Sequence, residues 1–232
     1  MLIDNIKIIR YRIDSAAKRA QRDGAAITMV AVTKYASLSQ VREALSSGIL
    51  CEVGENRVQD AERKKLSLGE LAAKVRWRLI GHLQTNKAKK AAALFDAVDS
   101  IDSEKVARAL DAALLGSGRA LEVMIQVKLS EIQTQSGVTP ERLPSLLEAL
   151  KNCRSLDVRG LMGIAPHVDP VEAVRPSFRL LRELRDRHLP GGKLSMGMSR
   201  DFEIAIEEGA DLVRIGSQIF SHPSPATMEA PA

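Results

Sequence analysis

Residues 27–37 read ITMVAVTKYAS, a run of apolar and small residues that reaches Lys34 and then a set of turn-forming residues. The run predicts a short strand, and residues 38–47 have the apolar periodicity of a helix. A lysine that closes an apolar strand is either a solvated strand end or a buried amine held for chemistry. The stretch alone leaves both roles of the lysine open, but its strand–turn–helix order is the unit that repeats along the chain.

The same order recurs from here to the end of the chain. Helical patterns lie between apolar runs, at residues 38–47, 55–67, 85–94, 103–115, 140–151, 170–188 and 199–208. Eight strands alternating with helices over about 190 residues predict an α/β protein, a single (β/α)8 barrel of the TIM type. An open doubly wound sheet is the alternative. The strands are expected at residues 27–33, 50–53, 76–80, 96–99, 121–127, 157–162, 193–196 and 211–215.

An extra N-terminal helix is expected before the first strand. Ile6, Ile9 and Ile13 recur at helical spacing, and Asp4 is the expected N-cap. Other helices carry similar signals, since capping residues precede them and glycines follow them. The expected starts are Ser103, Thr139 with Pro140, and Ser199, and the expected stops are Gly116 and Gly209.

The chain is expected to form one domain, because no linker rich in Pro, Gly or Ser divides it. The barrel is assigned to residues 1–220, and residues 221–232 (SHPSPATMEAPA) are expected to be a flexible tail. The N-terminus lacks the continuous apolar region of a signal peptide, and no stretch approaches the ~20 apolar residues of a membrane span. A cytoplasmic protein without a membrane partner is expected.

The composition is that of an ordinary soluble domain, with 45% hydrophobic and 27% charged residues. The net charge of +5 is spread among acidic residues, and aromatic residues make up only 3%, so nucleic acid binding is disfavoured. Cys51 and Cys153 stand far apart without metal-type spacing. Neither a disulfide framework nor a metal site is therefore expected.

Polar side chains and glycines recur at the predicted carboxyl ends of the strands, where a barrel of this type carries its chemistry. The chain reads SMGMSR at residues 195–200 and RIGSQIF at residues 214–220. Small residues and free backbone N–H groups at helix starts predict a phosphate site at Ser199, Gly216 and Ser217. The alternative is that the glycines serve only the turns.

Lys34 is expected near this phosphate site. It can act as a point charge for a phosphate, or as an amine that forms a Schiff base. The second role needs a partly desolvated amine whose neutral form is accessible, so Lys34 should lie sheltered in the barrel mouth. Spacing alone does not separate the two roles. A sensor of phosphate ligands that uses Lys34 only as a charge therefore stays open.

Six segments carry a family resemblance, and in chain order they read AVTKYAS, VGENRVQDA, WRLIGHLQTNKAKKA, SIDSEKVARAL, GLMGI and LSMGMSRDFEIAIEEGADLVRIGSQIF. From Ile27 to Phe220 the chain resembles the pyridoxal phosphate homeostasis proteins. The resemblance implies a barrel like the N-terminal domain of alanine racemase, with pyridoxal 5′-phosphate (PLP) held as a Schiff base on Lys34. It implies a monomer that buffers PLP or delivers it to PLP-dependent apo-enzymes, without substrate turnover of its own.

The resemblance also implies the residues around the cofactor. Arg214 would face the pyridine nitrogen, and Ser199, Gly216 and Ser217 would hold the phosphate. Because an arginine is always charged and only donates, it keeps that nitrogen unprotonated and makes the ring a weak electron sink. A ring of this kind suits storage of the cofactor, or at most racemase-like chemistry. The implied cofactor-binding residues are Lys34, Asn56, His82, Met196, Ser199, Arg214, Gly216 and Ser217.

A small PLP-dependent amino-acid racemase is the enzymatic alternative. It needs a second proton-transfer group opposite the lysine, usually a tyrosine of a further domain, and few residues follow Phe220. The two tyrosines are Tyr11, in the leading helix, and Tyr35, expected on the strand face opposite Lys34. The second base is therefore expected to be absent.

The chain departs from the family pattern in the segment SEIQTQSGV. Ile132 and Gln135 stand where the family often has an acidic residue and a lysine. No role of that lysine in passing PLP onward, or in a second binding site, is carried over. Ser217 replaces a more usual threonine but keeps the hydroxyl group.

Overall fold

The computed structural model describes residues 1–130 and 135–221. Eight parallel strands form a closed barrel in chain order, in which each strand pairs with the next and β8 pairs with β1. The predicted (β/α)8 barrel is thus confirmed, and the open doubly wound sheet is excluded. The strands are β1 (Thr28–Val32), β2 (Glu52–Glu55), β3 (Arg76–Leu79), β4 (Ala97–Ile101), β5 (Leu121–Lys128), β6 (Leu156–Ile164), β7 (Lys193–Met198) and β8 (Leu212–Ile215).

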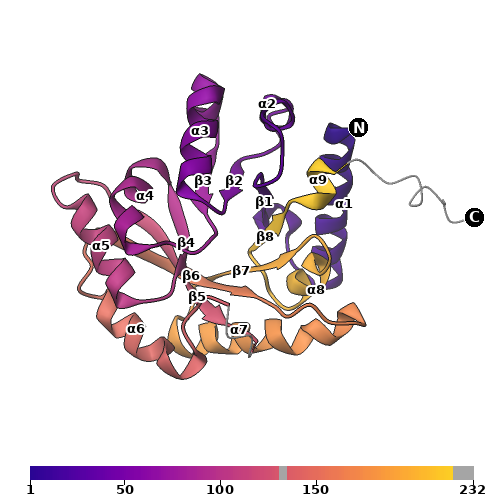
Figure 1. Cartoon of the computed structure of the whole chain (residues 1–232). Helices are drawn as coiled ribbons and strands as arrows, with labels where there is room; N and C mark the ends of the chain where they lie inside the picture. Colours follow the sequence, from indigo (N-terminus) through magenta and orange to yellow (C-terminus); the bar gives the residue numbers. More distant parts are fainter. Residues whose placement is uncertain (131–134, 222–232) are drawn as a thin grey trace, which may run out of the picture.

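The helices surround the barrel (Figure 1). The extra N-terminal helix α1 is confirmed, and it packs against α8 and α9 rather than following a strand. The Asn5 side chain on α1 donates to the carbonyl of Ile219 on α9 at 3.2 Å. The helices are α1 (Leu2–Arg19), α2 (Leu38–Ser46), α3 (Val58–Leu68), α4 (Ala88–Leu94), α5 (Glu104–Leu114), α6 (Leu143–Leu150), α7 (Arg175–His188), α8 (Phe202–Glu207) and α9 (Ser217–Phe220).

Two predicted helix starts are wrong. Helix α1 begins at Leu2 with Met1 as its N-cap, and Asp4 lies inside the first turn, where its carboxylate accepts from the Met1 ammonium at 2.8 Å. Helix α8 begins at Phe202 with Asp201 as its N-cap, so Ser199 does not cap it. In both cases an acidic residue near the true start favours the helix dipole, and several neighbouring polar residues compete for the cap.

Two further boundaries differ from the predictions. Glu55 was expected to open a helix but is the last residue of β2, and α3 begins at Val58. The helix expected after Thr139 begins with a 3-10 turn, Pro140–Arg142, that leads into α6. Of the predicted tail (residues 221–232), residues 222–232 lie outside the described residues, so the domain limit of 220 stays a prediction.

The barrel has two apolar layers, because successive side chains of a strand point to opposite faces. Residues such as Val53 and Val213 face outward and join the large core between the strands and the helices. A second, smaller cluster fills the barrel interior, as side chains do in barrels of eight strands. The interior cluster is formed by Val30, Met124, Met162 and Leu212.

Arg78 on β3 organises a charged layer inside the barrel. Its guanidinium donates to Asp99 at 2.8 Å, to Glu52 at 2.8 Å and to Glu122 at 2.7 Å, so it links β3 to β2, β4 and β5. Arg78 is only 1% exposed. Burial lowers the pKa of the guanidinium, but the three carboxylates outweigh burial and raise it. The ion cluster therefore joins four neighbouring strands.

The protein is expected to lose stability in acid through Glu122. Burial raises the pKa of this carboxyl, but hydrogen bonds from Arg76 and the charge of Arg78 outweigh burial and leave the pKa below its ordinary value of 4.5. A lowered folded-state pKa contributes stability that is present above the ordinary value and is lost as the pH falls through the lowered one. Urea unfolding midpoints measured from neutral pH downward should fall in that window. The fall should be shallower in Glu122→Gln, and equal slopes would contradict this assignment.

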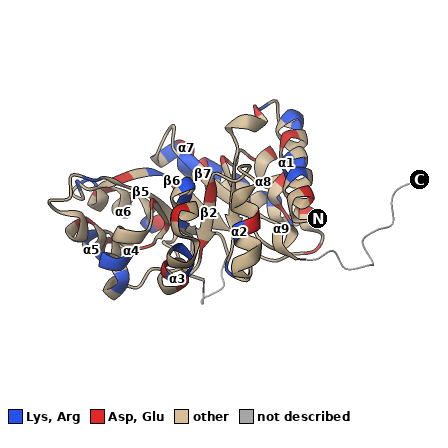
Figure 2. Ribbon diagram, turned by 90° about the horizontal axis from the view of Figure 1, so that it is seen from above, with Lys and Arg blue, Asp and Glu red and all other residues tan. Residues whose placement is uncertain are grey.

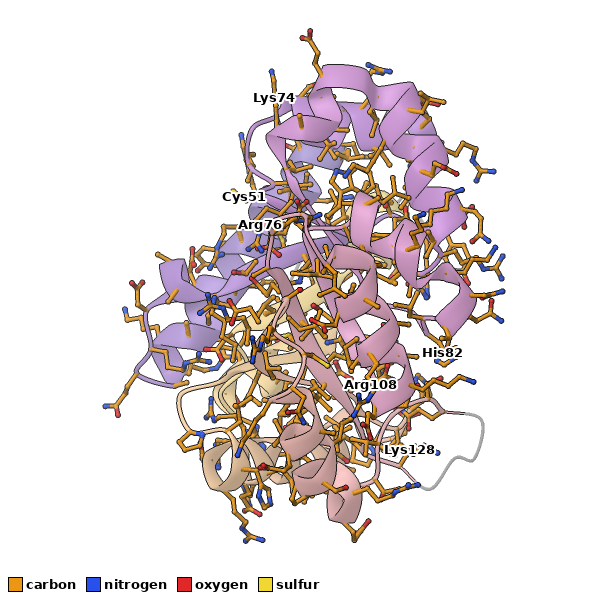
Figure 3. The ribbon with its side chains drawn as sticks, turned by 90° about the vertical axis from the view of Figure 1, so that its left-hand side faces the viewer. Cys51, Lys74, Arg76, His82, Arg108 and Lys128 are labelled. Carbon is orange, nitrogen blue, oxygen red and sulfur yellow. The ribbon has the colours of Figure 1, made fainter. Side chains whose placement is uncertain are left out.

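The two ends of the barrel carry different side chains (Figure 3). Cys51 and Arg76 lie at the end where the strands begin, and His82 and Lys128 lie at the end where they finish.

Lys and Arg are interspersed with Asp and Glu along the ribbon, as Figure 2 shows, which agrees with the dispersed charge of the sequence. Within residues 1–130 and 135–221, no helix has the length and apolar character to cross a membrane.

Candidate functional site

A cavity of about 440 Å³ opens at the carboxyl ends of β1, β2, β7 and β8. Its size lies within the range of small-molecule pockets, roughly 300–1,000 Å³. Six of the eight residues predicted from the sequence to bind the cofactor line it together, although they come from distant parts of the chain. They are Lys34, Asn56, Ser199, Arg214, Gly216 and Ser217.

One corner of the cavity has the features of an anion site. The Gly216 N–H donates to the Ser199 hydroxyl oxygen at 3.4 Å, which brings the chain after β7 against the chain after β8. A Cβ on Gly216 would lie only 3.1 Å from the Val32 carbonyl oxygen, so glycine permits the close approach to β1. Ser217 then begins α9, whose first backbone N–H groups have no acceptor within the helix. These small residues and donors suit a phosphate.

Asp201 shapes the turn that presents Ser199. Its carboxylate accepts from the Met198 N–H at 2.6 Å, and its own N–H donates to the Met198 carbonyl at 3.1 Å. Burial raises the pKa of Asp201, and the Met198 hydrogen bond and the charge of Arg214 oppose that rise. The Ser199 carbonyl also accepts from the Gln218 side chain at 2.6 Å. The turn is therefore held from both sides.

Arg214 lies at the floor of the cavity and is 4% exposed. It donates to the Ser195 hydroxyl at 2.9 Å and to the Gly163 carbonyl at 2.8 Å, so β6, β7 and β8 fix its orientation. Burial lowers the pKa of the guanidinium, while the charges of Asp99 and Asp201 oppose the effect. A fixed donor at this depth can bind an acceptor atom of a ligand ring.

Lys34 stands in a turn beyond β1 rather than on the strand. The Ala36 N–H donates to the Thr33 carbonyl at 3.0 Å, and this turn makes both Lys34 and Tyr35 project at the cavity mouth. The Lys34 side chain is exposed, so the expectation of a sheltered amine is wrong. The expectation that the amine shares a cavity with the glycine–serine corner agrees with the structure.

Tyr35 was expected to point away from Lys34, and this expectation is also wrong. The alternation of side chains holds only along a strand, and β1 ends at Val32. The Lys34 Nζ lies 4.9 Å from the centroid of the Tyr35 ring, within the range of a cation–π contact. Tyr35 is 90% exposed and therefore borders the mouth of the cavity.

His82 and Met196 do not line the cavity, contrary to the prediction. Met196 is fully buried in the core between strands and helices, because the alternation along β7 points Ser195 inward and Met196 outward. Gly197 follows with φ +89°, and Met198 reaches the cavity in place of Met196. The His82 ring turns toward Asp102, with Nδ1 3.1 Å from a carboxylate oxygen.

Several other residues of the cavity were not predicted from the sequence. Most of them lie within the six segments that carry the family resemblance, but which of their side chains reach the cavity is decided only by the fold. Arg200 is held by Asp169 and by His167, at 2.6 Å from the His167 Nε2. The unselected residues include Tyr35, Ile80, Ile164, Met198, Arg200 and Phe220.

The departure from the family pattern after β5 has a structural counterpart. The Gln135 side chain donates to the Ile164 carbonyl at 2.8 Å and accepts from the Ser130 hydroxyl at 2.5 Å. Gln135 thus ties the loop after β5 to the end of β6, beside the cavity. Ile132 lies outside the described residues.

In the part of the chain that the structure describes, no group of His, Cys, Asp and Glu could hold a metal ion.

Comparison with known proteins identifies the class and then the family. Residues 5–223 match the family described as "Alanine racemase, N-terminal domain", in agreement with the barrel. The pyridoxal phosphate homeostasis protein of Pseudomonas aeruginosa is 40% identical over 220 residues, which cover 94% of this chain and 94% of that protein. That of Aquifex aeolicus is 37% identical over 222 residues, which cover 94% and 96%.

A solved structure is also similar to this chain over most of its length. PipY of Synechococcus elongatus, with PLP bound, matches with a TM-score of 0.77 and 34% identity, over 92% of this chain and 100% of that one. Fold and site therefore define a barrel of the alanine racemase N-terminal class. The chain belongs to the family of pyridoxal phosphate homeostasis proteins.

Proposed function

We propose that this protein binds PLP in the cavity at the carboxyl ends of the strands and takes part in PLP homeostasis by buffering or delivering the cofactor. One observation carries the proposal: Lys34, Arg214 and the glycine–serine corner line one cavity. The phosphate would lie at Ser199, Gly216 and Ser217, and the pyridine nitrogen at Arg214. The relatives named above, and PLP bound to PipY, support this choice of ligand.

Lys34 is proposed to hold PLP covalently. Its neutral amine adds to the aldehyde carbon, the C=N bond of a Schiff base forms and a water molecule leaves. The reverse step is hydrolysis, which needs water at the same carbon. The exposed position of Lys34 gives water that access, and this suits a protein that takes up the cofactor and gives it up again.

Storage is favoured over turnover by the surroundings of the amine. Racemisation needs proton-transfer groups on both faces of the ligand. Tyr35 is the tyrosine at the cavity, and its ring contacts Lys34 itself, so it lies on the side of the amine. Arg214, a donor toward the ring nitrogen, would leave the ring a weak electron sink. A racemase remains the alternative, and exchange of α-hydrogens for deuterium across a panel of amino acids would reveal it.

The proposal is tested by the ultraviolet–visible spectrum of the purified protein with PLP, before and after borohydride reduction. A Schiff base should give a near-visible absorbance band that reduction removes. Peptide mass mapping should then place the reduced adduct on Lys34. Binding of PLP without an adduct would support a sensor that uses Lys34 as a charge only, and no binding would refute the proposal.

We also infer that the protein works as a monomer in the cytoplasm, with PLP-dependent apo-enzymes as recipients. A closed barrel has no free sheet edge that would favour pairing with a second chain. Sedimentation at the mass of one chain, with and without PLP, would agree with this inference, and a dimer would overturn it.

A further inference from the structure

Thr33, the residue directly before the Lys34 turn, has each of its polar groups bonded. Its N–H donates to the Gly54 carbonyl at 3.1 Å, and its hydroxyl donates to the Glu55 carboxylate. Its carbonyl accepts from the Ala36 N–H, which closes the turn, and from the Lys64 ammonium at 2.5 Å. The turn that carries Lys34 is therefore anchored at its base by Glu55 and Lys64.

Glu55 and Lys64 form a buried ion pair between the barrel and its helix layer. Glu55 ends β2, Lys64 lies on α3, and the Lys64 Nζ is 2.5 Å from the Glu55 Oε1. The two side chains are 0% and 10% exposed. The second carboxylate oxygen of Glu55, Oε2, is buried and lacks a hydrogen-bond partner among the residues that the structure describes.

Stability alone is a weak reason for such a pair. Removing two charges from water costs several kcal/mol per ion, and apolar residues of similar volume often stabilise a protein as well or better. An apolar pair, however, cannot supply directional hydrogen bonds. The Glu55–Lys64 pair offers one acceptor to the Thr33 hydroxyl and one donor to the Thr33 carbonyl, and together these bonds define where the chain leaves β1.

We propose that Glu55 and Lys64 are positioning residues for Lys34: through Thr33 they hold the turn that places Lys34 at the mouth of the cavity. Neither side chain lines the cavity, so both act through the backbone. The inference rests on the proposed function, since it assumes that Lys34 forms a Schiff base with PLP. By this inference, Glu55 and Lys64 influence how fast the Schiff base forms and which lysine forms it.

Two variants test the positioning role. Lys64→Met removes the donor to Thr33, but it leaves the Glu55 charge buried without its partner, which strongly destabilises a fold. The double variant Glu55→Gln with Lys64→Met removes both charges and still lacks that donor. If the single variant does not fold, the double variant carries the test.

Lys65→Met is the matched control. Lys65 follows Lys64 on α3, is half-buried and donates at 2.5 Å to the carbonyl of Leu94, the last residue of α4, rather than to the Lys34 turn. The same lysine-to-methionine change is thus made on the same helix. It removes an ammonium–carbonyl bond of the same kind without touching Thr33. A general loss of stability in α3 should therefore affect the Lys64→Met and Lys65→Met variants alike.

The measurements are the rate of Schiff base formation with PLP, per folded protein, and the share of borohydride-fixed adduct that maps to Lys34. Misplacing a reacting group costs up to about 100-fold in rate, so the Lys64 variants should react at least about 10-fold more slowly than wild type. More of their adduct should also map to other lysines, and Lys65→Met should match wild type in both readings.

Equal rates and equal mapping in folded Lys64 variants and Lys65→Met would overturn the inference and leave the ion pair a purely structural feature. Wild-type protein without an adduct on Lys34 would instead overturn the Schiff base on Lys34 that the proposed function includes. The two failures are therefore distinguishable in one set of samples.

Discussion

Lys34→Ala is expected to lose most of the borohydride-fixed PLP adduct and of the near-visible absorbance band. Alanine has no amine that can condense with the aldehyde, and other lysines of the chain lack the nearby anion corner that would hold the phosphate of PLP against them. The measurement is the spectrum with PLP before and after reduction, together with the intact mass of the reduced protein.

Two companion variants make the result specific. Lys34→Arg keeps the positive charge, but a guanidinium stays protonated in proteins and cannot form the Schiff base. It should lose the adduct while retaining noncovalent PLP binding better than Lys34→Ala does. Lys89→Ala, at an exposed position on α4, should behave as wild type. An adduct of wild-type yield in Lys34→Ala would show that the amine at position 34 is not the attachment site.

Arg78→Met is expected to cause the largest loss of stability. It leaves the carboxylates of Glu52, Asp99 and Glu122 in the barrel interior without the guanidinium that they share. Removing one partner of a buried ion pair typically costs about 3–5 kcal/mol. Here Asp99 loses its guanidinium donor, and Glu52 and Glu122 keep only Arg76 as an arginine partner. Urea denaturation followed by circular dichroism should show a large drop in midpoint, or no folded protein.

The control for this variant is Arg108→Met. Arg108 pairs with Glu104 on the surface of α5, where both side chains are about half exposed, 62% and 47%. Exposed pairs contribute roughly 0–1 kcal/mol, so its midpoint should stay near that of wild type. If Arg78→Met and Arg108→Met unfolded at the same urea concentration, the interior cluster would have no special role in stability.

Much of the fold was predictable from the sequence because short apolar runs and helical patterns alternate without a break. The eight predicted strands all occur, each within two residues of its expected bounds. Helix starts were less predictable. Asp4 and Ser199 are good capping residues, but Met1 and Asp201 hold those positions, since several polar residues near each start can satisfy the free N–H groups.

The site was predictable where residues lie at strand ends and not where the chain turns. Ser199, Arg214, Gly216 and Ser217 come together because neighbouring parallel strands finish at one end of the barrel. Met196 was misplaced because side chains alternate along β7, so that Ser195 points inward and Met196 outward. Gly197, at φ +89°, then breaks the alternation, and Met198 lines the cavity. His82 was misplaced because the bend after β3 turns it toward Asp102.

By itself the sequence determined the closed barrel, the family and the group of residues at its carboxyl end, because hydrophobic periodicity and local motifs are properties of the chain alone. Only the tertiary structure decided the direction of each side chain at the cavity. The anchoring of Thr33 by Glu55 and Lys64, which supports the turn that carries Lys34, joins segments far apart in sequence. Such contacts form only when the strands have closed into a barrel, so no local pattern records them.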